Sequence, residues 1–181
     1  TETEIEKAKP YLIKKINSQK VVSLILGGPN KYYSFDESQL IQIFNKIKSN
    51  FVSEGYKVIV IPSMRTPKAS IELAKKEMGS CGHVVNSVDK QAYLSAYALA
   101  NYIVVTCDST SMISEAATSG KPIFIAHMNA KRNNYRFKRF FDLFKKMGIA
   151  RDLGEKIETW SYNKHNEAER IATLINNKIK N

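Results

Sequence analysis

Five short apolar runs alternate with segments of helical periodicity, and this alternation constrains the fold more than any other feature of the chain. The runs are Val21–Leu26, Val58–Ile61, His83–Val85, Tyr102–Thr106 and Ile123–Ala126. Runs this apolar are typical of strands buried on both faces, as in a parallel sheet covered by helices. Right-handed crossovers between five such strands favour the order 3-2-1-4-5. The sequence therefore predicts the α/β class, with a Rossmann-like parallel sheet and helices on both of its faces.

The segments between and after these runs predict the helices. We expect helices over residues 1–18 with a break near Pro10, 36–51 with Asp36 as the N-cap, 66–79, 90–100, 135–147 and 166–178, besides one between the fourth and fifth runs. Pro67 is expected at the first position of its helix, where a fixed φ and a missing N–H are tolerated. With 181 residues and no internal repeat, residues 1–181 are expected to form a single Rossmann-like domain.

The chain is strongly basic, with a formal net charge of +11 and a pI near 9.6. This charge favours anionic partners, namely nucleotides, nucleic acid or an acidic membrane surface. Genomic base composition is an alternative source of the many lysines and asparagines. Because the sequence holds no DNA- or RNA-binding signature, we expect no nucleic-acid partner. No apolar run approaches the ~20 residues of a membrane span.

The two cysteines, Cys81 and Cys107, fit no metal-ligand spacing and are expected to be free thiols. The acidic start Thr1–Glu6 resembles no signal or transit peptide and lacks an initiator Met. We therefore expect a cytoplasmic location, with the inner face of a membrane as an alternative. We also expect the chain to be an excised part of a longer protein.

The most informative string, Cys107–Pro122, lies between the fourth and fifth runs. Ser109 and Ser111 place hydroxyls in its first helical turn, where free N–H groups and the positive end of a helix dipole attract anions. Glu115 shares a face with Ser111, so its carboxylate can accept hydrogen bonds from a sugar diol while the turn holds a phosphate. The alternative is an ordinary well-capped helix in which Glu115 pairs locally, for example with Lys121.

The predicted strand order makes the first and fourth strands neighbours, and ligands bind beyond the carboxyl ends of such a pair. Gly27 and Gly28 are expected to face Asp108–Ser111 there. Arg65, within Pro62–Pro67 after the second strand, can clamp a phosphate bidentately. The alternatives are tight turns that need glycine for geometry only and an ordinary surface arginine.

Two further features lie after the fifth strand. His127 is a general-base candidate, but the sequence shows no acidic partner for it, which favours a structural role. Residues 135–146 alternate aromatic and cationic side chains, with four phenylalanines on one face. This pattern favours a core helix with a solvated basic back, and the alternative is peripheral contact with an anionic membrane.

Several enzyme motifs are absent from the sequence. No GxGxxG follows the first run, and there is no Walker lysine, zinc-type spacing or nucleophile elbow. We therefore expect neither a dinucleotide cofactor nor a metal, and no catalytic residue is assigned.

Several segments together resemble one known family. They are Leu24–Gly28, Pro62–Pro67, Val104–Ala116, Gly120–Pro122 and Arg136–Phe141. In this order they look like the mitochondrial fission (elongated-mitochondria) family of plants and many bacteria, whose bacterial members often carry the label "predicted nucleoside-diphosphate-sugar epimerase". The resemblance covers essentially the whole chain, and the Asp-Ser-x-Ser-Met-x-Ser-Glu run at 108–115 is its most specific part.

That family is similar in turn to GT-B glycosyltransferases and to UDP-sugar 2-epimerases of the same fold, whose C-terminal domain binds the nucleotide-sugar. The resemblance implies a Rossmann-like C-terminal domain of a two-domain protein. It places the glycine pair near the diphosphate, the two serines on phosphate, Glu115 on the ribose and residues 86–88 near the base. The ligand-binding set that follows is Gly27, Gly28, Ser63, Arg65, Thr66, Asp108, Ser109, Ser111, Met112 and Glu115.

Four positions depart from the family pattern. Met64 stands where a second arginine is usual, which weakens an anion clamp, and Asn101 stands where an aspartate is usual. Gln91 and Ala92 replace an Asn-Pro pair before Tyr93.

The implied function is the donor half of a GT-B-like glycosyltransferase. It binds a nucleotide or nucleotide-sugar, UDP-linked as the first choice, as substrate and not as cofactor. Because a GT-B active site lies between two domains, residues 1–181 alone are expected to bind weakly and to catalyse nothing. One alternative is a non-catalytic interaction module that uses its basic surface for membrane or protein partners, and a further alternative is a nucleoside-diphosphate-sugar epimerase.

Overall fold

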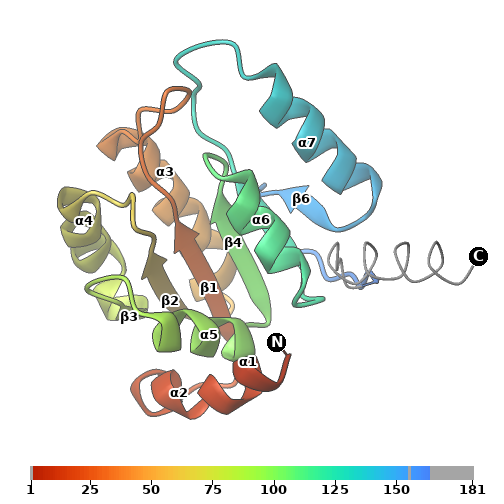
Figure 1. The fold of residues 1–181 in the computed structure, drawn as a ribbon. Helices are drawn as coiled ribbons and strands as arrows, with labels where there is room; N and C mark the ends of the chain where they lie inside the picture. The colour runs from red at the N-terminus through yellow and green to blue at the C-terminus, as the bar shows by residue number, and fades with distance from the viewer. Residues whose placement is uncertain (1, 155, 164–181) are drawn as a thin grey trace, which may run out of the picture.

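The computed structural model describes residues 2–154 and 156–163. These residues form one parallel sheet of six strands in the order β3-β2-β1-β4-β5-β6 (Figure 1). The strands are β1 (Val21–Leu26), β2 (Lys57–Pro62), β3 (Gly82–Val84), β4 (Tyr102–Thr106), β5 (Ile123–Ala126) and β6 (Ala150–Asp152). The predicted order of the first five strands is confirmed, and β1 lies between β2 and β4.

Helices cover both faces of this sheet (Figure 1). They are α1 (Glu2–Ala8), α2 (Pro10–Ile16), α3 (Glu37–Ile47), α4 (Lys68–Met78), α5 (Lys90–Leu99), α6 (Thr110–Ala117) and α7 (Tyr135–Lys146). A π-helical turn over Lys48–Val52 extends α3, and a 3-10 turn over Gly79–Cys81 ends α4. α3 packs against α4, whereas α5 packs against α1 and α2. The predicted helix over 166–178 lies outside the described residues.

Two predicted helix starts differ in detail from the structure. Pro67 is the N-cap of α4, which begins one residue later at Lys68. Asp36 is the N-cap of α3, but no helix N–H bonds to its side chain. Its carboxylate instead accepts hydrogen bonds from the Ser34 hydroxyl and, at 2.9 Å, from the Gln39 side-chain amide.

The sixth strand, β6, was not predicted from the sequence. It pairs with β5 in parallel, with Ala150 opposite Ile123 and Asp152 opposite Ile125. It is three residues long, and only Ala150 is buried, so it lacks the apolar run that marks the other strands. Its consequence is local: it brings Asp152 to the carboxyl edge of the sheet.

The central strand is buried along its whole length and is fixed by polar contacts at two points. The Ser23 hydroxyl donates to the carbonyl of Ala96 on α5 at 2.8 Å, which satisfies a buried polar group. The side-chain oxygen of Asn101 accepts a hydrogen bond from the Val21 amide at 2.7 Å, where β1 begins. These contacts hold β1 against α5 and against the residue that precedes β4.

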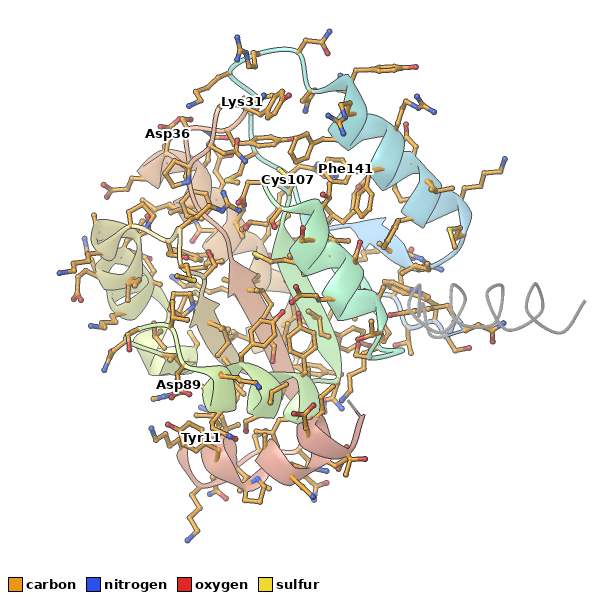
Figure 2. All side chains as sticks on the ribbon, in the orientation of Figure 1. Tyr11, Lys31, Asp36, Asp89, Cys107 and Phe141 are labelled. Atoms are coloured by element: carbon orange, nitrogen blue, oxygen red, sulfur yellow. The ribbon has the colours of Figure 1, made fainter. Side chains whose placement is uncertain are left out.

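Asp89 caps α5 and ties it to α2. Its Oδ1 accepts hydrogen bonds from the amides of Gln91 and Ala92 at 2.8 and 3.0 Å, and its Oδ2 accepts one from the Tyr11 hydroxyl at 2.6 Å. Figure 2 shows Tyr11 and Asp89 next to each other at the end of the molecule that holds α1 and α2. The hydrogen bond from Tyr11, followed by the one from Ala92, lowers the pKa of Asp89 below its usual value.

We predict that Asp89→Ala lowers the free energy of unfolding by about 1 kcal/mol, the usual effect of losing an N-cap. Tyr11→Phe keeps the cap and removes one donor, so it should cost less. Because the pKa of Asp89 is lower in the folded state, its contribution is full above about pH 4 and is lost as the pH falls through the folded pKa. Urea unfolding of the three proteins at neutral and acidic pH measures this. Equal stability of Asp89→Ala and the unsubstituted chain at neutral pH would show that the cap is unimportant.

Candidate functional site

The carboxyl ends of β1, β2 and β4 bring three sequence-distant turns together. The Gly28 amide donates to the Asp108 carboxylate at 3.0 Å, and the Gly27 amide donates to the Thr106 hydroxyl at 2.8 Å. Arg65, from the turn after β2, donates from Nη2 to Asp108 at 2.8 Å and from Nη1 to the Gly28 carbonyl at 2.8 Å. The structure therefore places the glycine pair, Arg65 and Asp108 at one point on one sheet edge.

Both glycines are required by close approach. A Cβ on Gly27 would lie 2.0 Å from a carboxylate oxygen of Asp108, and one on Gly28 would lie 2.0 Å from the carbonyl oxygen of Arg65. Neither distance is compatible with a side chain. Both amides are also bonded within the protein. The missing side chains therefore let the chain pass close to Asp108 at Gly27 and close to the backbone of Arg65 at Gly28.

The Asp108 carboxylate is the centre of this arrangement. Its side chain is fully buried, whereas that of Arg65 is 40% exposed. One carboxylate oxygen, Oδ1, accepts from the Thr106 hydroxyl at 2.7 Å, and the other accepts from Gly28 and Arg65. The Asp108 carbonyl in turn accepts from the Asn30 side chain at 2.9 Å. A buried carboxylate needs such partners, because an unpaired charge is strongly disfavoured away from water.

The turn after β2 is held by hydroxyl contacts. The Thr66 hydroxyl accepts from the Ser63 amide at 2.8 Å and donates toward the Gly27 carbonyl at 2.6 Å. The Ser63 hydroxyl accepts from the Arg65 amide at 3.3 Å. Ser63 and Thr66 therefore shape the turn that presents Arg65, and their hydroxyls are engaged within the protein.

The first turn of α6 follows Asp108 directly. Ser109 is its N-cap, and the Ser109 hydroxyl accepts from the Met112 amide at 3.4 Å. The amides of Thr110 and Ser111 begin the helix and have no acceptor within it. Ser111 is exposed and Ser109 half-buried. Arg65 contacts Asp108, two residues before Thr110, so its guanidinium lies near the amides that begin the helix.

Glu115 is one turn further along α6 and is exposed. Its Oε2 accepts a hydrogen bond from the Tyr93 hydroxyl at 2.6 Å, and that hydroxyl lies 3.0 Å from the hydroxyl of Tyr97. Burial, reinforced by Tyr97 and Glu115, raises the pKa of Tyr93, so this hydroxyl remains a donor. Lys121, the partner considered from the sequence, donates to the carbonyl of Ala98 at 3.1 Å and to that of Ala100. Sequence analysis missed Tyr93 as the partner of Glu115.

His127 has the acidic partner that the sequence did not reveal. Its Nε2 lies 2.6 Å from Oδ1 of Asp152, and Lys145 lies 3.1 Å from the other oxygen. Burial alone would raise the pKa of Asp152, but the hydrogen bonds from His127 and Lys145 outweigh it and lower that pKa. The imidazole also packs edge-on against Phe141, with ring centroids 5.2 Å apart. The pair was missed because Asp152 belongs to the unpredicted strand β6.

A cavity of about 430 Å³ opens beside this pair. Tyr33, Asn134 and Lys138 line it together with His127 and Lys145. It lies at the same carboxyl edge as the Asp108 cluster, because β5 is next to β4.

The phenylalanines of α7 face the core, as the favoured interpretation of that helix predicted. Phe141 and Phe144 are buried, and Phe137 and Phe140 pack against the core from partly buried positions. Figure 2 shows Phe141 on the side of α7 that faces Cys107.

Over residues 2–154 and 156–163, no group of three or more histidine, cysteine, aspartate or glutamate side chains is placed to hold a metal ion. Within the same residues, no helix has the length and apolar character needed to cross a bilayer.

Comparison with known sequences gives one family and two relatives. The sequence model of the family described as "Mitochondrial fission ELM1" matches residues 1–179. The "Uncharacterized protein RP120" of Rickettsia prowazekii (strain Madrid E) is 32% identical over 182 residues, which cover 95% of this chain and 49% of the relative. The "Mitochondrial fission protein ELM1" of Arabidopsis thaliana is 29% identical over 164 residues, which cover 88% and 38%. The chain therefore spans less than half the length of these curated relatives.

Among solved structures, the UDP-GlcNAc 2-epimerase from Neisseria meningitidis bound to UDP-GlcNAc aligns with a TM-score of 0.49 and 15% sequence identity. The alignment covers 97% of this chain and 40% of that one.

We predict that Arg65→Met lowers the free energy of unfolding by about 3 kcal/mol, because it leaves the buried carboxylate of Asp108 without its cation. Arg136→Met, on the exposed side of α7, is the matched control and should change stability by less than about 0.5 kcal/mol. Urea unfolding of both variants measures the difference. If the two variants are equally stable, the Arg65–Asp108 pair does not hold the turns together.

Proposed function

The chain belongs to the mitochondrial fission ELM1 family, and from that premise we propose that it is the nucleotide-binding half of a longer, GT-B-like glycosyltransferase. Its ligand is a nucleotide or nucleotide-sugar, with UDP as the nucleotide to test first. The observation that carries the proposal is the convergence of Arg65 and the first turn of α6 on Asp108.

The diphosphate is assigned to the start of α6. The free amides of Thr110 and Ser111 and the positive end of the helix dipole favour an anion there. Ser109 and Ser111 add hydroxyls, and Arg65 adds a partly exposed cation with five N–H donors, of which Asp108 and the Gly28 carbonyl engage two. The glycine pair contributes by its close fit and not by donating amides, since both amides are bonded within the protein.

The ribose is assigned to Glu115. Tyr93 holds one oxygen of this carboxylate, which orients the group and leaves its second oxygen to accept from a ribose hydroxyl. Because Glu115 is exposed and its partner Tyr93 is partly buried against the core, the carboxylate is positioned without being enclosed. Charge-assisted hydrogen bonds of this kind contribute roughly 1.5–3 kcal/mol each.

Epimerisation of a nucleotide-sugar is the second candidate function. The observation that favours it is the His127–Asp152 pair, an oriented proton-transfer group on the same sheet edge as the α6 turn. In the longer protein, an epimerase converts a nucleotide-sugar without an acceptor, whereas a glycosyltransferase needs an acceptor. An assay without any acceptor therefore distinguishes the two functions.

We predict that UDP stabilises the chain and that Glu115→Gln weakens UDP binding by about ten- to a hundredfold. At ~100 times its Kd, a ligand adds about 2.7 kcal/mol of stability, so thermal unfolding with a panel of nucleotides and nucleotide-sugars detects binding. Isothermal titration of UDP into the two proteins then measures the affinity ratio. Tyr93→Phe should weaken binding by less than Glu115→Gln does, because it only releases the orientation of the carboxylate.

Glu6→Gln, at an exposed position on α1, is the control for the loss of one negative charge. The ribose assignment also requires that the unsubstituted chain bind 2′-deoxy-UDP less tightly than UDP. In Glu115→Gln, the affinities for the two nucleotides should differ by less. A Glu115→Gln variant that melts earlier and binds UDP unchanged would mean that Glu115 serves the fold. If no nucleotide stabilises the chain, the proposed function is wrong.

A further inference from the structure

Helix α7 has an outward face that the core does not use. Tyr135, Arg139, Leu143 and Met147 follow one another at intervals of four residues, which places them along one side of the helix. The three apolar members are strongly exposed, at 63% for Tyr135, 53% for Leu143 and 48% for Met147. The Arg139 guanidinium lies over the Tyr135 ring, 5.8 Å from its centroid. The phenylalanines of the same helix point the other way, into the core.

Positive charge is concentrated on this helix and the loop before it. Residues 131–146 hold seven cationic side chains and a single acidic one, Asp142, which gives a net charge of +6. That is more than half of the +11 carried by the whole chain. Asp142 lies 3.5 Å from Lys145, which also pairs with Asp152, so the one acidic side chain of this segment is matched by a lysine of the same helix.

We propose that the outward face of α7 docks on an anionic lipid membrane. Cations alone suit any polyanion, but three exposed apolar side chains among them favour a bilayer interface, where such groups enter the headgroup region while lysine and arginine contact anionic lipids. The helix is 12 residues long, so it lies along the surface and does not cross the bilayer. The inference rests on α7 alone and does not depend on nucleotide binding.

The rest of the fold is compatible with this orientation. α7 lies at one rim of the molecule, at the opposite end from α1 and α2 (Figure 1). The α7 residues that line the cavity beside His127 include Lys138, Phe141 and Lys145, none of which belongs to the outward row. Docking by the outward row therefore leaves that cavity accessible from its own side.

The test is sedimentation of the chain with phosphatidylcholine vesicles, with and without phosphatidylserine. We expect binding only with phosphatidylserine, and weaker binding at higher salt. Arg139→Ala combined with Lys146→Ala should lower the partition coefficient about thirtyfold, because each basic residue near an anionic surface contributes about a factor of five. The double substitution Leu143→Ser and Met147→Ser keeps every charge and should lower it at least tenfold.

Matched controls come from the opposite end of the molecule. Ile13→Ser removes an apolar side chain that is 41% exposed on α2. Lys7→Ala combined with Lys14→Ala removes two exposed cations from α1 and α2. Both controls should bind like the unsubstituted chain apart from a small general effect of charge, and circular dichroism melting checks that all variants are folded.

Three outcomes would overturn the proposal. The first is equal binding of the Leu143→Ser, Met147→Ser variant and the unsubstituted chain, since charge alone would then account for binding. The second is a control that loses as much binding as its α7 counterpart. The third is absence of vesicle binding while this face self-associates in gel filtration or binds transfer RNA, which would assign it to a second copy or to nucleic acid.

Discussion

The arrangement of the candidate site depends on one buried charge, the carboxylate of Asp108. It lies where β4 meets β1, and it draws together the end of β1, the turn after β2 and the start of α6. A carboxylate without solvent must have its oxygens satisfied. Here Thr106 is a neighbour in sequence, but the other two donors, Arg65 and Gly28, come from parts of the chain about 40 and 80 residues away. The ion pair with Arg65 therefore neutralises the Asp108 charge and also fixes the turn after β2 relative to the start of α6. This explains why two adjacent glycines are needed, because the loop passes Asp108 at Gly27 and the backbone of Arg65 at Gly28 too closely for a side chain.

Much of the fold could be predicted from the sequence because its signals are local. The runs at Val21–Leu26 and Tyr102–Thr106 are apolar throughout, and both are buried strands, so the order of the first five strands followed from general rules of handedness. β6 could not be predicted in this way. Its three residues, Ala-Arg-Asp, are mostly exposed, and only pairing with β5 makes them a strand. The strand forms only because it pairs with β5. For the same reason, Asp152 could not be predicted as the partner of His127.

The candidate site was predictable in location but not in the roles of its members. The sequence placed Gly27, Arg65 and Asp108 at one edge, and the structure brings them together there. The structure also shows hydrogen bonds between different helices and strands, which residue spacing along the sequence does not reveal. Arg65 is bonded to Asp108, and Glu115 accepts a hydrogen bond from Tyr93 on α5. That nucleotides bind at this edge stays a prediction.

The carboxylates of Asp108, Asp152 and Glu115 differ in burial, and this difference indicates different roles. Asp108 is fully buried, and both of its oxygens are bonded within the protein, so its charge serves the structure. Asp152 is half-exposed, with one oxygen on His127 and one on Lys145, so both oxygens already have a protein partner and the carboxylate can orient the imidazole. Glu115 is exposed and holds Tyr93 with one oxygen. A carboxylate that is oriented by one partner and open on its other oxygen suits the recognition of a ligand hydroxyl, because the orientation is fixed before the ligand arrives. Of the three, Glu115 is therefore the group whose substitution we expect to weaken ligand binding and leave the fold intact.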